Sequence, residues 1–119
     1  MKKSEFDNRP DLVVNEGSQV RISFDAEQVE KEIQPAGEGQ PTVRQIWEAY
    51  VVRVEEPLTR SRVIDAIITA KYPNDVMQAV QNNYLANPKD TDAKAEMDAM
   101  QAWRTYAKEV ATQVMVAIA

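Results

Sequence analysis

A cluster of four acidic residues has the spacing that comes nearest to a metal site. These residues are Asp90, Asp92, Glu96 and Asp98, and they first suggest a Ca²⁺-binding loop. An EF-hand loop needs an oxygen ligand at its fifth position and a glycine at its sixth, and this chain has lysine and alanine there. Carboxylates in the first turn of a helix are favoured by the helix dipole. We therefore interpret this cluster as the start of a helix with a solvated acidic face.

General acid–base chemistry has no better candidates. Glu55 and Glu56 are adjacent at the end of a predicted strand, where neighbouring side chains point to opposite faces and cannot converge on one substrate. The sequence contains no histidine and no cysteine, which excludes an imidazole base, a thiolate nucleophile and a Cys/His zinc site. We therefore predict no catalytic residue, no metal site and no cofactor, and we expect a protein that is not an enzyme.

Arg44, Arg53 and Arg62 give the clearest indication of an anion-binding site. The first two lie on a predicted strand and the third lies on the helix that follows it. Guanidinium groups bind carboxylates and phosphates well, so the alternative function is a small-ligand-binding or regulatory domain that recognises an acidic ligand. Surface ion pairs are the simpler interpretation, because Arg62 and Asp65 are three apart on a helix and such pairs contribute less than about 1 kcal/mol each.

The charge balance argues against nucleic acid as a partner. The net charge is −5, with 14 Lys and Arg scattered among 19 Asp and Glu, whereas nucleic-acid affinity depends on clustered basic residues. The longest uncharged apolar run, VATQVMVAIA, is much shorter than a bilayer span. The N-terminal MKKSEFDNRP lacks the apolar segment of a secretory signal. We expect a cytoplasmic protein that binds no nucleic acid and no membrane.

The segment from Ile46 to Tyr72 organises the predicted fold. Residues 46–54 are rich in β-branched and aromatic side chains, which favours a strand. Pro57 ends this strand, and an amphipathic helix is predicted from its N-cap Thr59 to Ala70. Such a helix must fold back over the sheet to bury both apolar faces.

Both faces of the predicted strand carry apolar residues. One face has Ile46, Tyr50, Val52 and Val54, and the other has Trp47, Ala49 and Val51. This pattern indicates either a central strand or a second buried surface.

The residues before this strand are predicted to be β-rich. Residues 1–10 are expected to form a flexible arm unless another element holds them. Residues 11–24 fit a hairpin with a tight turn at Asn15-Glu16-Gly17-Ser18. Residues 25–34 fit either a short helix or a strand that turns at residues 35–41 and returns from Thr42. We favour the strand, because a one-turn helix would bury little.

Two further helices are predicted after Pro73. The first runs from Asp75 to about Leu85 and presents to the core Val76, Met77, Val80 and Tyr84. The second begins near Asp90 and, at nearly thirty residues, is about 45 Å long. Its apolar stripe is Ala93, Met97, Met100, Trp103, Ala107, Val110, Val114 and Ile118. A small domain cannot cover a helix of this length, so part of it must project or pack on another chain.

The last helical turns are the most apolar surface of the chain. Five residues are spread around most of the helix circumference, namely Val110, Val114, Met115, Val116 and Ile118. A helix that is apolar on all sides is buried on all sides. Either this end inserts into the core of the domain or it docks on another protein. In the second case these residues, with Trp47 on the second face of the strand, are the predicted contacts for a protein partner or for self-association.

Four consecutive segments resemble a class of small prophage-encoded proteins found near tail and baseplate genes. They are WEAYVVRVEEP, LTRSRVIDAIITAKY, NDVMQAVQNNYL and AWRTYAKEVA, and together they cover about residues 46–111. The resemblance implies an accessory or structural protein of phage assembly that has protein partners and performs no enzymatic step. Such a protein could be incorporated in a phage particle. No site residues follow from it.

These observations predict one α+β domain over residues 1–119. Residues 11–55 would form an antiparallel hairpin or meander, and residues 58–119 would form two short helices and one long C-terminal helix. The expected function is a non-enzymatic protein–protein interaction or assembly module, plausible for a phage tail accessory protein.

Overall fold

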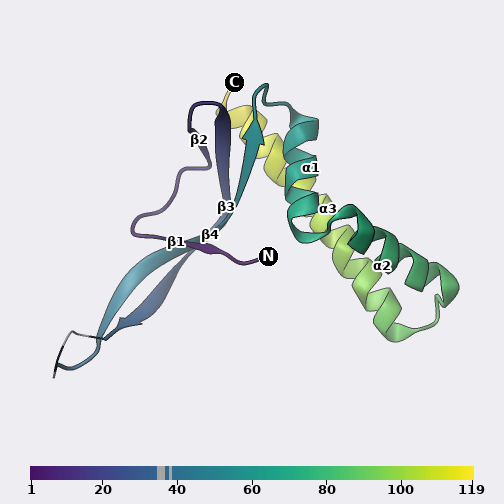
Figure 1. The fold of residues 1–119 in the computed structure, drawn as a ribbon, viewed down its shortest axis with the longest axis horizontal. Coiled ribbons are helices and arrows are strands. Elements are labelled where there is room, and N and C mark those ends of the chain that lie inside the picture. Colours follow the sequence, from purple (N-terminus) through teal and green to yellow (C-terminus); the bar gives the residue numbers. More distant parts are fainter. Residues whose placement is uncertain (35–36, 38) are drawn as a thin grey trace.

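The computed structural model describes residues 1–34, 37 and 39–119, which form four strands and three helices. The predicted α+β class is confirmed. The strands make one antiparallel sheet in the order β1-β4-β3-β2 (Figure 1). In chain order the elements are β1 (Ser4–Phe6), β2 (Val13–Asn15), β3 (Gln19–Ile33), β4 (Thr42–Glu55), α1 (Arg60–Lys71), α2 (Asn74–Ala86) and α3 (Thr91–Ala117).

The long hairpin of β3 and β4 is the main part of the sheet. Its ladder runs from the pair Gln19–Glu55 to the pair Ile33–Thr42, so the strand prediction for residues 25–34 is confirmed and the helix alternative is wrong. The predicted turn at residues 35–41 lies partly outside the described residues. β4 lies between β1 and β3, which is the central position that its two apolar faces suggested.

A bulge interrupts the β3–β4 ladder between Phe24 and Glu27. Asp25 has a φ of 53°, in the left-handed region that side chains other than glycine rarely occupy. The bulge changes the direction of β3 at the point where the hairpin leaves the helices.

The β2–β3 hairpin forms at the predicted turn. Gly17 has a φ of 97°, and its backbone N–H donates to the side-chain oxygen of Asn15 at 2.9 Å. Asparagine and glycine therefore supply the turn geometry that the sequence indicated.

The main core lies between one sheet face and helices α1 and α3. β3 contributes Val20, Ile22 and Phe24, which lie opposite residues of β4 that face the same way. Trp103 of α3 packs on Phe24 with ring centroids 6.1 Å apart. The aromatic residues at this position are therefore part of the core, as their spacing predicted.

The three helices begin and end close to the predicted positions. The Thr59 side chain accepts a hydrogen bond from the Arg62 backbone N–H, which confirms it as the N-cap of α1. The Asp90 side chain caps α3 in the same way by accepting from Asp92. In α2, however, Val80 is buried whereas Val76 is 41% exposed, so the prediction that Val76 belongs to the core is wrong. α2 packs against α3, and the sheet stops short of it (Figure 1).

The molecule is elongated. Its radius of gyration is 18.2 Å and its extents are 58 × 39 × 20 Å, whereas a compact domain of this length has a radius of gyration of about 13.5 Å. The β3–β4 hairpin and the α2–α3 turn lie toward opposite ends of the long axis (Figure 1). Two parts of the chain thus project from a central core.

Candidate interaction site

The far part of the β3–β4 hairpin projects into solvent as a two-stranded ribbon. We call residues 27–33 and 42–48 the arm. Successive residues 30–33 of β3 are all exposed, as are residues 42–45 of β4. Because alternate strand residues point to opposite faces, both faces of the arm are solvated. Over the described residues, the strands in the outer part of the arm pair only with each other.

The sequence of the arm suits this exposed position. Residues 27–33 of β3 are mostly charged or polar, with Val29 and Ile33 as the apolar side chains, and Gln45 of β4 donates to Glu30 at 3.2 Å. Charged side chains along an open strand edge oppose uncontrolled pairing with other chains. Val43 is 64% exposed and Ile33 is 38% exposed, so the outer arm combines charges with small apolar contacts.

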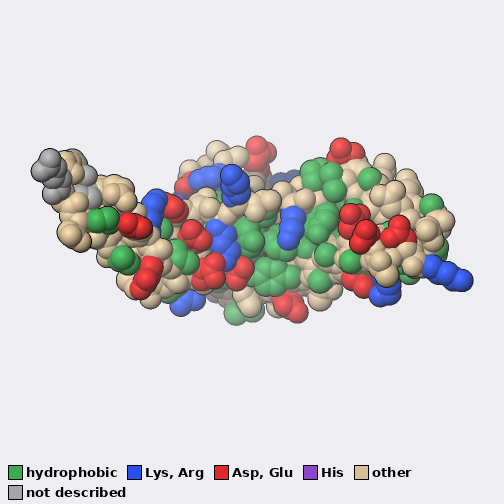
Figure 2. Space-filling view, turned by 90° about the horizontal axis from the view of Figure 1, so that it is seen from below, with side chains coloured by type: hydrophobic (Ala, Val, Ile, Leu, Met, Phe, Trp, Pro, Cys, Tyr) green, Lys and Arg blue, Asp and Glu red, His purple; other side chains and the backbone are tan. Residues whose placement is uncertain are grey.

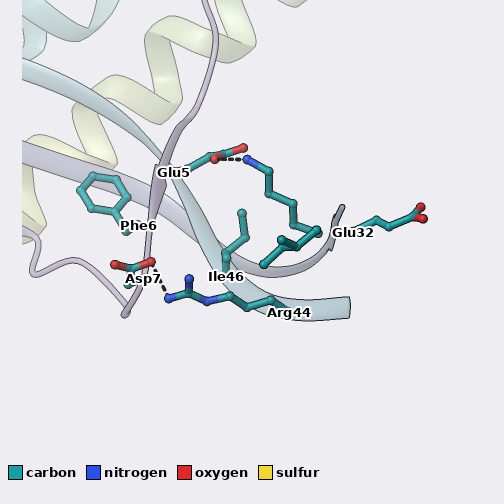
Figure 3. A pocket seen from close by; sticks show the side chains of 8 residues that line it. Glu5, Phe6, Asp7, Glu32, Arg44 and Ile46 are labelled. Atoms are coloured by element: carbon teal, nitrogen blue, oxygen red, sulfur yellow. Dashed lines mark hydrogen bonds and ion pairs between the residues drawn. The ribbon is translucent and has the colours of Figure 1, made fainter. Parts of the chain in front are cut away.

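β1 pairs with the base of the arm at Trp47, and ion pairs connect β1 to side chains farther along the arm. Glu5 pairs with Lys31 at 2.6 Å, and Asp7 pairs with Arg44 at 2.8 Å. Figure 3 shows Ile46, which is buried, lying between these two pairs in an open hollow of about 550 Å³. We call this arrangement of β1 and the arm the clasp. The N-terminal residues 1–10 are therefore not a flexible segment, because β4 pairs with Ser4–Phe6.

Lys3 adds a third connection between the N-terminal segment and β3. Its Nζ lies 3.2 Å from Asp25 and 3.1 Å from Glu27, and 5.1 Å from the centre of the Tyr50 ring. Partial burial lowers the pKa of Lys3, but the hydrogen bonds and charges of Glu27 and Asp25 outweigh that effect and raise the pKa above its ordinary value of 10.5.

Trp47 lies at the base of the arm and is only half-buried. It pairs with Phe6 of β1 and Gln28 of β3, and the Arg9 guanidinium lies 5.6 Å from its ring centre. Part of this predicted partner-binding residue is therefore covered by the chain's own N-terminal segment, and part remains accessible beside the arm.

The predicted C-terminal contacts divide into two groups. Val110 and Val114 are 2% and 0% exposed and belong to the main core, so they are not available to a partner. Met115 is half-buried, whereas Val116 is 72% exposed and Ile118 is 44% exposed. Within this chain the sheet and α1 cover only one side of the helix end, so a partner contact at Val116 and Ile118 stays a prediction.

The three predicted anion-binding arginines are not brought together. Arg44 and Arg53 are nine residues apart on β4, or about 30 Å along an extended strand. Arg44 pairs with Asp7, Arg53 pairs with Glu16 at 2.9 Å, and Arg62 donates to the backbone oxygen of Glu55 at 3.4 Å. Each guanidinium has its own partner, and one small acidic ligand could not span all three.

The remaining candidate acidic groups have structural roles. Asp98 pairs with Lys94 at 2.9 Å on the solvent side of α3. Across residues 1–34, 37 and 39–119, no three acidic side chains are grouped closely enough to hold a metal ion. Within the same residues, no helix is both long and apolar enough to cross a membrane.

The clasp is the feature that the sequence did not reveal. Glu5 and Asp7 are distant in sequence from their partners Lys31 and Arg44, and only the strand order brings them together. The alternating charges of β3 were a usable signal of a solvated ribbon, but they did not indicate which segment would hold its base.

Comparison with known proteins adds no relative. No protein-family model, no curated protein and no solved structure matches the chain.

Proposed function

We propose that this protein is a non-enzymatic interaction module of a larger protein assembly, and that the arm contacts a neighbouring protein subunit. The observation that carries this proposal is the solvation of the arm on both faces along its outer half. A two-stranded ribbon alone is marginally stable in water, and the outer arm adds little to the core. Its ordering is accounted for if it provides a contact surface.

The clasp supports the same function. Ion pairs from β1 reach the arm at Lys31 and Arg44, and they favour one direction of the outer arm. A contact element that is held in one direction before binding loses less conformational entropy when it binds. The charged side chains of the arm favour a polar, specific contact over general adhesion.

The assembly that we propose is a phage tail or its baseplate region, with the protein made in the cytoplasm and able to enter the particle. The support is the resemblance of residues 46–111 to small prophage-encoded proteins. A projecting ribbon on a small α+β core would suit a subunit that reaches a neighbour in such an assembly.

Single-cysteine crosslinking tests the function of the arm, because the natural chain has no cysteine. Val43→Cys places a thiol on the arm, and Ser61→Cys places one on an exposed position of α1. Each variant would carry a thiol-attached photocrosslinker and be co-expressed with the products of the neighbouring genes. We expect one defined adduct from the arm position and none from α1.

A second variant makes the crosslinking result specific. Lys31→Glu with Arg44→Glu reverses the two charges that the clasp holds, and in the Val43→Cys background it should abolish the adduct. Equal adducts from both thiol positions, or none from either, would refute the proposal. Light scattering would show whether the adduct partner is another subunit type or a second copy.

Self-association through the C-terminal end of α3 is a second candidate, favoured by the exposure of Val116 and Ile118. Deleting the last ten residues would not test it, because that deletion also removes core residues. Val116→Asp with Ile118→Asp keeps the core intact. If light scattering shows that the natural chain is a dimer and this double variant is a monomer, the C-terminal end of α3 is the interface. If both proteins are dimers, the C-terminal end is excluded as the interface.

A further inference from the structure

Helices α2 and α3 leave an apolar surface uncovered on the side of the molecule away from the arm. Val80 is the buried residue of α2, while Val76 on the same helix is 41% exposed. Ala99 and Ala102 of α3 are exposed as well. The two helices pack against each other with Val80, Ala93 and Met100 buried, whereas Val76, Ala99 and Ala102 stay open to solvent.

Three shallow hollows adjoin one another along α3. The middle hollow, of about 520 Å³, lies between Val76 and Ala79 of α2 and Glu96 and Ala99 of α3. The next, of about 470 Å³, shares Ala99 and continues past Trp103. The third, of about 290 Å³, shares Glu96 with the middle one. We call these hollows together the helical groove.

The floor and the length of the helical groove suit an α-helix. Its exposed floor residues Ala79, Ala99 and Ala102 have methyl side chains, and small side chains at a helix contact allow a short interaxial distance. The lining residues of α3 run from Asp92 to Tyr106, which is about 21 Å of helix. A partner helix of about four turns would match that length.

The rim of the helical groove is acidic. Five carboxylates line the three hollows, namely Asp25, Asp75, Asp90, Asp92 and Glu96. Asp25 is paired with Lys3, and Lys71 is the basic residue among the lining side chains. The Lys71 Nζ lies at one end, 4.5 Å from the centre of the Trp103 ring. Figure 2 shows hydrophobic side chains gathered on the helical part of this face, with Asp and Glu beside them. The arm in the same view carries charges of both signs.

We propose that the helical groove binds an amphipathic α-helix of a partner protein, with an apolar stripe flanked by lysine or arginine. The stripe would lie on the alanine floor, since helix recognition in a groove uses apolar anchors spaced three and four residues apart. The flanking cations would meet Asp75 and Glu96 in the middle of the groove. This surface is separate from the arm, so it would give the protein a second binding partner or a second contact with the same one.

A designed peptide tests this inference directly. The probe is a helical peptide of about 16 residues with a leucine stripe flanked by lysines, and its control carries glutamates in place of the lysines. Binding would be measured by calorimetry at about 150 mM NaCl, where long-range attraction is screened. We expect the lysine peptide to bind the natural chain and the glutamate peptide to bind at least about tenfold more weakly.

Matched variants separate the groove from general charge attraction. Asp75→Lys with Glu96→Lys should weaken binding of the lysine peptide about tenfold or more. Asp65→Lys with Asp98→Lys makes the same change in net charge outside the groove and should alter binding less than about threefold. Ala99→Trp fills the floor at an exposed position and should weaken binding about tenfold without loss of helical circular dichroism.

Three results would overturn the inference. One is no binding of the lysine peptide, and another is an equal loss in both charge-reversed pairs. The third is a natural chain that is already dimeric by light scattering and becomes monomeric on Ala99→Trp, because the groove would then hold a second copy. None of these results bears on the arm, whose test uses a different position and a different readout.

Discussion

The indole N–H of Trp103 in α3 donates a buried hydrogen bond to the backbone oxygen of Ile67 in α1, with a distance of 2.9 Å. The same ring packs on Tyr50 of β4 with centroids 5.6 Å apart. One side chain thus fixes the crossing of two helices and the distance of both from the sheet.

Replacing this indole should destabilise the whole domain. Trp103→Phe removes the buried donor and part of the ring volume, and we expect the free energy of unfolding to fall by about 1–3 kcal/mol in urea titrations. Trp47→Phe at the half-buried base of the arm is the matched control and should cost less than about 1 kcal/mol. Equal losses for the two variants would show that the hydrogen bond and the core position of Trp103 contribute nothing specific.

The two faces of the C-terminal helix should respond differently to truncation. Val114 is fully buried, so Val114→Ala should lower the free energy of unfolding by about 1.5–3 kcal/mol. Val116 is 72% exposed, and Val116→Ala should change it by less than about 0.5 kcal/mol. Chemical denaturation of the monomer measures the free energy of unfolding of the Val114→Ala and Val116→Ala variants. A large loss at Val116 alone would mean that this side chain is covered in solution.

The bulge at Asp25 should tolerate asparagine but not a β-branched residue. Asparagine accepts the left-handed conformation, whereas valine at a φ of 53° is strained. We expect Asp25→Val to cost about 1–3 kcal/mol more than Asp25→Asn, as measured by thermal or urea unfolding. Both variants remove the charge that pairs with Lys3, so their difference combines the backbone effect with the hydrogen bond that the asparagine oxygen can still accept from Lys3. Similar stabilities would mean that the bulge relaxes without cost.

The domain should become less stable in alkaline solution. The raised pKa of Lys3 means that its favourable pairing is complete below 10.5 and is lost as the pH rises through its higher folded-state value. Burial, and then the charge of Asp25, raise the pKa of Tyr106 above 10.0, so ionisation of its phenol opposes folding above that pH. The Lys3 and Tyr106 effects both lower the free energy of unfolding as the pH rises, because the folded state binds more protons than the unfolded state at these two groups.

Urea titrations between about pH 9 and about pH 11 would measure this loss. Lys3→Met and Tyr106→Phe should each make the decline in stability shallower, and Lys2→Met, at an exposed neighbouring position, should leave it unchanged. If the decline is the same in all four proteins, these two groups are not its cause.

The α+β class, the three helices with their N-terminal ends at Thr59 and Asp90, and the β2–β3 turn at Gly17 could all be predicted from the sequence. These features depend on side-chain periodicity and on local backbone preferences, which a sequence displays directly. The three-dimensional arrangement was needed to show that Ser4–Phe6 joins β4, that Val110 and Val114 are covered while Val116 is exposed, and that the three arginines each have a different partner. The reason is that pairing across a sheet and the coverage of a helix depend on which distant segments become neighbours, and local patterns do not specify those neighbours.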